Sequence, residues 1–88
     1  MERDEFIGIL ASDGFDVIVT VEQQANAILD VHAHPFEAKA LVLAGELCLC
    51  IDDTEHVYQA GQMFHLRANE AHSERFGPAG VTYLVGRK

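Results

Sequence analysis

Beyond position 15, apolar residues gather in short stretches that are bounded by turn signals, a pattern typical of strands. The first, residues 16–22, is rich in β-branched side chains. Further stretches of this kind occupy 27–34, 39–45, 46–51, 56–59, 63–67, 72–76 and 81–86. Turns are predicted between them, with the strongest signals at Asp52-Asp53, Ala60-Gly61 and the GPAG segment 77–80. Short strands at regular spacing predict an all-β, antiparallel sandwich or barrel.

The two ends of the chain have a different pattern. In residues 2–12 acidic side chains come first, and Phe6 and Leu10 then lie on one helical stripe, with Gly14 as a stop signal. This predicts a short helix that must lie across an apolar surface, because it is too short to stand alone. The final Arg87-Lys88 is predicted to be a charged tail. We therefore expect one domain over 1–88, with a helix and turn over 1–14 and a β-barrel over 15–88.

Composition narrows the function classes. The formal charge of −8 and the lack of any lysine or arginine cluster argue against binding to nucleic acid or to an anionic membrane surface. No apolar run approaches the length of a membrane span, and the first residues do not resemble a signal peptide, so we expect a cytoplasmic protein. A small domain with many apolar strand residues also predicts a homodimer formed through sheet faces or edges.

Histidines carry the clearest chemical signal. Residues two apart on a strand share a face, so His32 and His34 can present two imidazoles to one cation. His72, from a distant strand, is expected to fold back against them and complete a site of three nitrogens with open positions. Imidazole ligands suit several divalent transition metals, among them Zn, Cu, Fe and Ni.

With these residues assembled, the sequence resembles a small single-domain cupin, whose fold is a double-sheet jelly roll. The first cupin motif is a glycine, an H-x-H pair, a glutamate and a closing glycine. Here the corresponding positions are Asn26, His32, His34, Ala38 and Gly45. In the second motif Gly61 and His72 match, and the usual proline, glycine and asparagine are replaced in this chain by Arg67, Asn69 and Phe76.

The resemblance implies a metal site of His32, His34 and His72, with Zn, Fe, Ni, Mn or Cu as the ion. The family's acidic ligand is missing, because Ala38 occupies its position. Glu37 is the nearest candidate to replace it. Strict alternation would turn Glu37 away from the histidines, whereas a bulge at Pro35 would turn it back.

The two remaining histidines and the two cysteines are weaker candidates for a functional role. We expect His56 to be a surface residue and His65 to face away from the interior, on the opposite face from its apolar neighbours. Cys48 and Cys50 share a strand face in poor geometry for a disulfide. They are expected to pack as small hydrophobic residues, with a pair of thiolate ligands as the alternative.

The resulting functional hypothesis is a metal-binding cupin with a His-lined pocket for a small molecule. Arg67, Glu74 and Tyr83 are candidates for the polar groups that contact that molecule. The alternative is a metal-dependent enzyme, such as a dioxygenase, isomerase or lyase acting on a small polar substrate. No Ser-His-Asp or Cys-His pattern of a nucleophilic enzyme is present.

Overall fold

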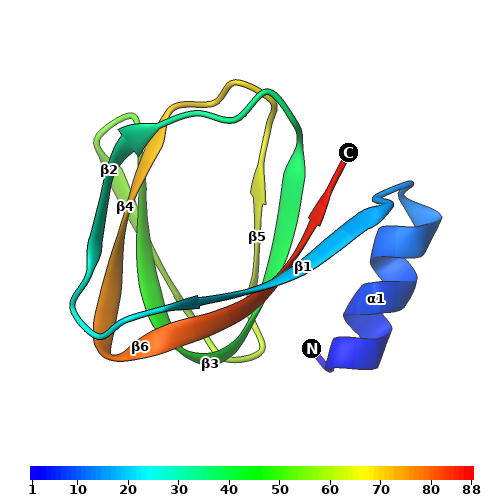
Figure 1. The fold of residues 1–88 in the computed structure, drawn as a ribbon, viewed down its shortest axis with the longest axis horizontal. Helices are drawn as coiled ribbons and strands as arrows, with labels where there is room; N and C mark the ends of the chain where they lie inside the picture. Colours follow the sequence, from blue (N-terminus) through cyan, green and yellow to red (C-terminus); the bar gives the residue numbers. More distant parts are fainter.

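Two long antiparallel strands organise the molecule. The computed structural model describes all 88 residues and contains one helix and six strands (Figure 1). Strands β3 and β6 pair with each other along most of their length, and every other strand pairs with one of them. The elements are α1 (Arg3–Ser12), β1 (Val17–Gln23), β2 (Ile28–His32), β3 (Ala38–Ile51), β4 (Thr54–Gln59), β5 (Met63–Leu66) and β6 (His72–Arg87).

The sheet is folded over itself into two layers. One layer contains β1, the second half of β6, the first half of β3, and β5. The other contains β2, the first half of β6, the second half of β3, and β4. The predicted all-β antiparallel jelly roll with a short N-terminal helix is therefore confirmed.

Glycines form the corner where β3 and β6 bend from one layer into the other. Gly45 of β3 and Gly80 of β6 both have positive φ angles, 78° and 74°. A Cβ atom on Gly45 would lie 2.1 Å from the carbonyl oxygen of Gly80, and one on Gly80 would lie 2.6 Å from that of Gln23. The corner thus requires residues without a side chain, both for the backbone conformation and for the close approach.

This corner explains where the predicted strand boundaries were wrong. Stretches 39–45 and 46–51 are one strand, and so are 72–76 and 81–86. The GPAG segment bends the chain but remains part of β6, because glycine lets the backbone turn while the pairing resumes beyond it. The predicted charged tail is also wrong for Arg87, which lies in β6 opposite Val17 on one side and Ala38 on the other.

Apolar side chains form two clusters, one inside the barrel and one beneath the helix. The larger lies between the layers and includes Val42, Leu47, Leu49, Phe64 and Phe76. The smaller joins α1 to the outer surface of the sheet and consists of Phe6, Leu10, Phe15, Leu41 and Leu84. The short helix therefore lies across an apolar surface, as predicted. With ten residues, it is not long and apolar enough to cross a membrane.

Candidate metal centre

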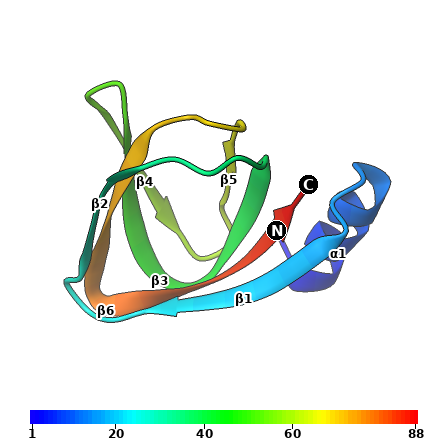
Figure 2. The ribbon, with the colours of Figure 1, turned by 45° about the horizontal axis from the view of Figure 1, so that its top comes forward.

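The β2–β3 and β5–β6 connections run side by side at one edge of the barrel (Figure 2). His32 is the last residue of β2 and pairs with His72, the first residue of β6. His34 lies in the connection between β2 and β3, where its carbonyl oxygen accepts a hydrogen bond of 2.6 Å from the backbone N–H of Asn69. That bond joins the β2–β3 connection to the β5–β6 connection beside it.

The three histidines meet as the sequence predicts. Their ligand nitrogens all lie within 4.8 Å of one another, and they form the one group of three or more potential metal ligands in the chain. The ring of His32 lies 4.2 Å from that of His72 and 5.0 Å from that of His34, measured between centroids. We call His32, His34 and His72 the three-His cluster.

Backbone carbonyls orient two of these rings. The Nδ1 atom of His32 lies 2.6 Å from the carbonyl oxygen of Asp30, and the Nδ1 atom of His72 lies 2.9 Å from that of Glu70. Nδ1 must donate in such a bond, so the neutral ring carries its lone pair on Nε2. A carbonyl that fixes the second nitrogen of a histidine is the usual support for a metal ligand.

His72 gives the sharpest indication that the cluster has a ligand. The residue is only 2% exposed. Its Nε2 atom is the single buried side-chain nitrogen or oxygen in the protein without a hydrogen-bond partner. Buried polar groups are rarely left unpaired because burial without a partner costs free energy. A cation bound by the cluster would pair this nitrogen.

The electrostatic environment keeps His34 neutral. Burial lowers the pKa of His34, and repulsion from His32, His72 and Arg87 lowers it further. The ring also stacks on Phe36, with 4.9 Å between centroids and an interplanar angle of 17°. Metal ligation needs the neutral imidazole, so this environment favours the form that binds.

Glu74 lies beside the cluster, inside the barrel. Its Oε2 atom lies 3.6 Å from Nε2 of His32 and 3.9 Å from Nε2 of His72. Burial raises the pKa of Glu74, against the opposing influence of these two histidines. Tyr83 is also buried, and burial together with the nearby Glu74 raises its pKa.

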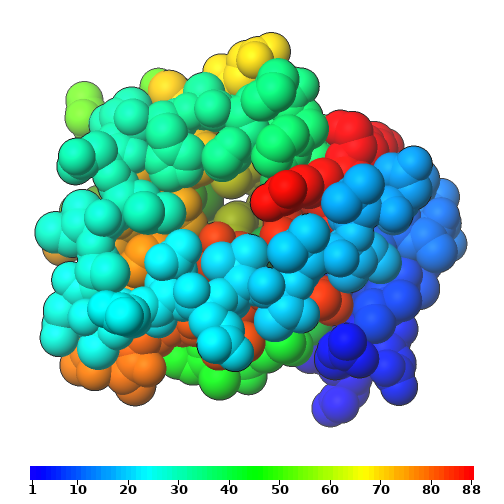
Figure 3. Space-filling model, viewed as in Figure 1, coloured from blue at the N-terminus to red at the C-terminus, as the bar shows by residue number.

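A cavity of about 60 Å³ adjoins the cluster. Its lining includes His34, His72, Ala38, Glu74, Tyr83 and Arg87. Figure 3 shows the molecule hollowed between β1, the β2–β3 connection and the end of β6, which supply part of this lining. Arg87 was missed from the sequence, although it lies an even number of residues after Tyr83 on the same strand and so shares its face.

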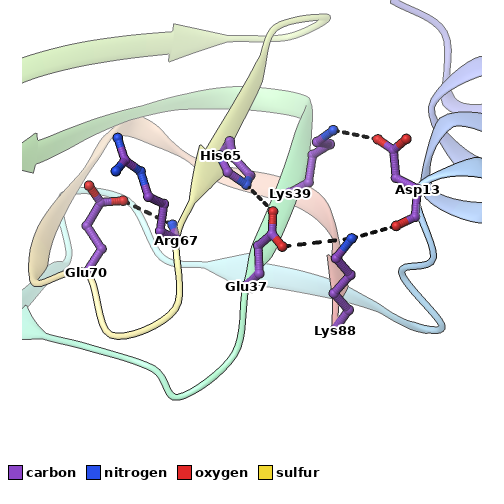
Figure 4. A network of polar contacts seen from close by, with 7 residues as sticks. All are labelled: Asp13, Glu37, Lys39, His65, Arg67, Glu70 and Lys88. Carbon is purple, nitrogen blue, oxygen red and sulfur yellow. Dashed lines mark hydrogen bonds and ion pairs between the residues drawn. The ribbon is translucent and has the colours of Figure 1, made fainter.

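Two predicted site residues lie elsewhere (Figure 4). The carboxylate of Glu37 is hydrogen-bonded to Nε2 of His65 and lies 3.9 Å from Nζ of Lys88, outside the three-His cluster. The hydrogen bond with His65 lowers the pKa of Glu37. Glu37 thus faces away from the cluster, as strict alternation predicts. Arg67 is exposed and does not line the cavity, and its backbone N–H donates to the Glu70 side chain.

The remaining histidine and the cysteines lie on the surface of the barrel. His56 is exposed, as expected. Cys48 and Cys50 are free, partly buried thiols that belong to no group of three potential metal ligands. The guanidinium of Arg75 lies 3.5 Å from Sγ of Cys48 and donates a hydrogen bond of 2.9 Å to Glu55.

The sequence matches a model of a known protein family. The family model described as the cupin domain matches residues 17–77, more than half of the chain. The chain belongs to the cupin family. The match includes β1 to β5 and the first residues of β6, and so contains all three histidines of the cluster.

Several solved structures have the same fold. An RmlC-like cupin from Shewanella frigidimarina superposes with a TM-score of 0.70 at 22% identity, over 81% of this chain and 64% of that one. An RmlC-like cupin from Desulfovibrio desulfuricans gives 0.65 at 26% identity, over 80% and 68%. A structure of the DMSP lyases RdDddP and RnDddQII gives 0.74 at 17% identity, over 81% and 37%. This cupin thus spans about two thirds or less of their lengths, and no curated protein matches its sequence.

Proposed function

We propose that this cupin binds one divalent transition-metal ion through the three-His cluster and presents it to a small molecule in the adjoining cavity. The unpartnered, buried Nε2 atom of His72 carries the proposal. That nitrogen has a lone pair directed into the cluster, and its surroundings provide no hydrogen bond. Three imidazoles that converge on one point provide the ligands that such an ion needs.

The donor set limits the metals to those that accept imidazole. Zn, Fe, Ni, Mn and Cu all belong to this class, and the choice among them depends on geometry and supply more than on affinity. Two of the rings are already oriented by backbone carbonyls, so little ordering is needed when the ion binds. When bound, such an ion supplies Lewis acidity to whatever occupies its open positions.

The cavity limits the size and polarity of the ligand. Its volume of about 60 Å³ admits only a small molecule or part of one. Apolar walls such as Phe64 and Val85 surround polar groups of Tyr83 and Arg87. Arg87 also lies over the ring of Phe36, 4.9 Å from its centroid, which holds the guanidinium at the cavity. A small polar or anionic molecule matches this lining.

Metal analysis of protein prepared without a histidine tag tests the proposal. We expect about one metal ion per chain, as a single three-nitrogen site requires. His72→Ala should remove most of this binding, because two histidines remain. His56→Ala is the matched control, since His56 is exposed and outside the cluster, and it should leave the affinity unchanged. Equal affinity in His72→Ala and the natural protein would contradict the proposal.

Catalysis by a metal-dependent lyase, dioxygenase or isomerase is the second candidate. The observation that favours it is the presence, in the cavity beside the cluster, of the Glu74 carboxyl, whose pKa is raised by burial, and of Tyr83, which stays protonated and can donate a hydrogen bond. The DMSP lyases with a similar fold make DMSP a suitable first probe. Loss of DMSP or consumption of oxygen by the metal-loaded protein would support catalysis, whereas binding without turnover would support a binding module.

A further inference from the structure

We infer that Glu74 is the carboxylate ligand of this metal site, provided from β6 in place of the family glutamate that Ala38 replaces. The inference rests on the proposed metal site and adds a fourth residue to it. The strand positions of His72 and Glu74 are the first observation in its favour. His72 and Glu74 are two apart on one strand, so their side chains share the face that points into the barrel.

The position of Glu74 is unusual for a carboxylate. In the strand register Glu74 lies between Leu29 of β2 and Leu49 of β3. It is 4% exposed, no hydrogen bond to its side chain is present, and its ion-pair neighbours are two histidines rather than a lysine or an arginine. Burial disfavours the ionised form of this carboxyl, so a cation beside it would stabilise the carboxylate. Its nearest polar neighbours are the Nε2 atoms of His32 and His72.

The geometry around these atoms fits a shared cation. Because Nδ1 of both histidines donates to a backbone carbonyl, each Nε2 atom presents a lone pair, as does the carboxylate. With both imidazoles neutral and Glu74 ionised, three acceptor atoms face one another, an arrangement that a cation would stabilise. The separations of 3.6 and 3.9 Å are too long for hydrogen bonds. Two ligands at usual metal distances lie roughly 3.0–3.5 Å apart, so a small contraction would let one ion bind all three.

The position at which the family glutamate is missing supports its replacement by Glu74. Ala38 lines the same cavity as Glu74 and His72, at the first residue of β3. A glutamate at position 38 would therefore reach the cluster from one layer, and Glu74 reaches it from the other. Glu37 does not take the place of the family glutamate, because its carboxylate is hydrogen-bonded to His65 outside the cluster.

Zinc titration against a chromophoric chelator tests the inference. Glu74→Gln keeps the shape of the side chain and removes its charge. We expect it to weaken Zn(II) binding by about tenfold or more, because even groups that only hydrogen-bond to a metal ligand have effects of this size. Glu37→Gln is the matched control and should leave the affinity unchanged. The double variant Ala38→Glu/Glu74→Gln should recover affinity, because a carboxylate returns from the opposite layer. Melting curves of the metal-free variants establish that each is folded.

The outcomes separate this inference from the proposed function. Loss of binding in His72→Ala with natural affinity in Glu74→Gln would overturn the role of Glu74 and leave the three-His site standing. If His72→Ala and Glu74→Gln both bind Zn(II) with the affinity of the natural protein, the three-His site and the role of Glu74 are both overturned. If Glu74→Gln does not fold, the natural protein provides the test: the ¹³C resonance of the Glu74 carboxyl should move when Zn(II) is added, and an unmoved resonance would overturn the inference.

Discussion

His32 and His72 lie opposite each other in the β2–β6 pairing, with 4.2 Å between their ring centroids. Each is fixed by a carbonyl two residues before it in the chain, that of Asp30 and that of Glu70. The cluster thus depends on strand register as well as on side chains. A slip of one residue between β2 and β6 would turn one of the two rings to the outside.

The metal-free protein should lose stability as the solution is acidified below neutral pH. Folding lowers the pKa of His34, so between that value and the unfolded value of about 6.5 the unfolded chain binds more protons. The contribution is complete above the unfolded pKa and disappears as pH falls through the folded one. Urea unfolding of the natural protein and of His34→Gln, in the presence of EDTA, checks this. Equal pH slopes for the two would contradict it.

The Glu37 carboxyl should titrate independently of the cluster. His65 lowers the pKa of the Glu37 carboxyl from its ordinary value of 4.5, so His65→Ala should raise it again. Any stability from this pair is present above that ordinary pKa and is lost as pH falls through the lowered one. Carboxyl ¹³C NMR titration measures the change. Zinc affinity should stay constant in the variant, and a drop would show that the pair supports the metal site.

The glycine corner should be intolerant of any side chain. Gly45→Ala places a Cβ atom 2.1 Å from the Gly80 carbonyl oxygen on a backbone with φ of 78°. The left-handed conformation alone costs an alanine about 1–2 kcal/mol, and the clash adds to this. Gly8→Ala is the control, because nothing lies within 4 Å of a Cβ atom in this helical position, and it should stabilise by about 0.5–1 kcal/mol. Chemical denaturation compares the two, and similar effects would contradict the role of the corner.

We also predict a homodimer. Apolar side chains are exposed on the strands β1 and β2, including Val17 at 50%, Ile28 at 64% and Val31 at 73%. Each of these strands pairs only with β6 and so has a free edge. Light scattering should give twice the chain mass of 9.7 kDa, and the Ile28→Lys/Val31→Lys variant should dissociate if β2 forms the contact. A monomeric mass for the natural protein would contradict the prediction.

Much of the site was predictable because it follows from strand alternation and from motif spacing. The H-x-H pair and His72 were placed together correctly, and alternation also turned His65 outward. His34 is less regular than expected, since it lies beyond the end of β2 and reaches the cluster through the connection. The meeting of β2 with β6 is a long-range pairing, which local pattern alone does not specify.

Other features depended on tertiary structure. The glycines at 45 and 80 signalled turns, but only the two-layer arrangement shows that they bend two strands without ending them. Glu74 was predicted only as a candidate to contact the small molecule, although its spacing from His72 puts the two residues on one strand face. Its burial between Leu29 and Leu49 follows from the register of three strands and is not apparent from the sequence.

Strands β3 and β6 run continuously through both layers, and this affects how the protein opens to solvent. We expect the two layers to open together, because β3 and β6 have pairing partners in both. Amide hydrogens in the layer that contains β1 and β5, such as those of Leu41 and Leu84, should therefore exchange with solvent mainly through opening of the whole barrel. A cation that binds the cluster would then slow exchange in this layer as much as in the layer of His32 and His72.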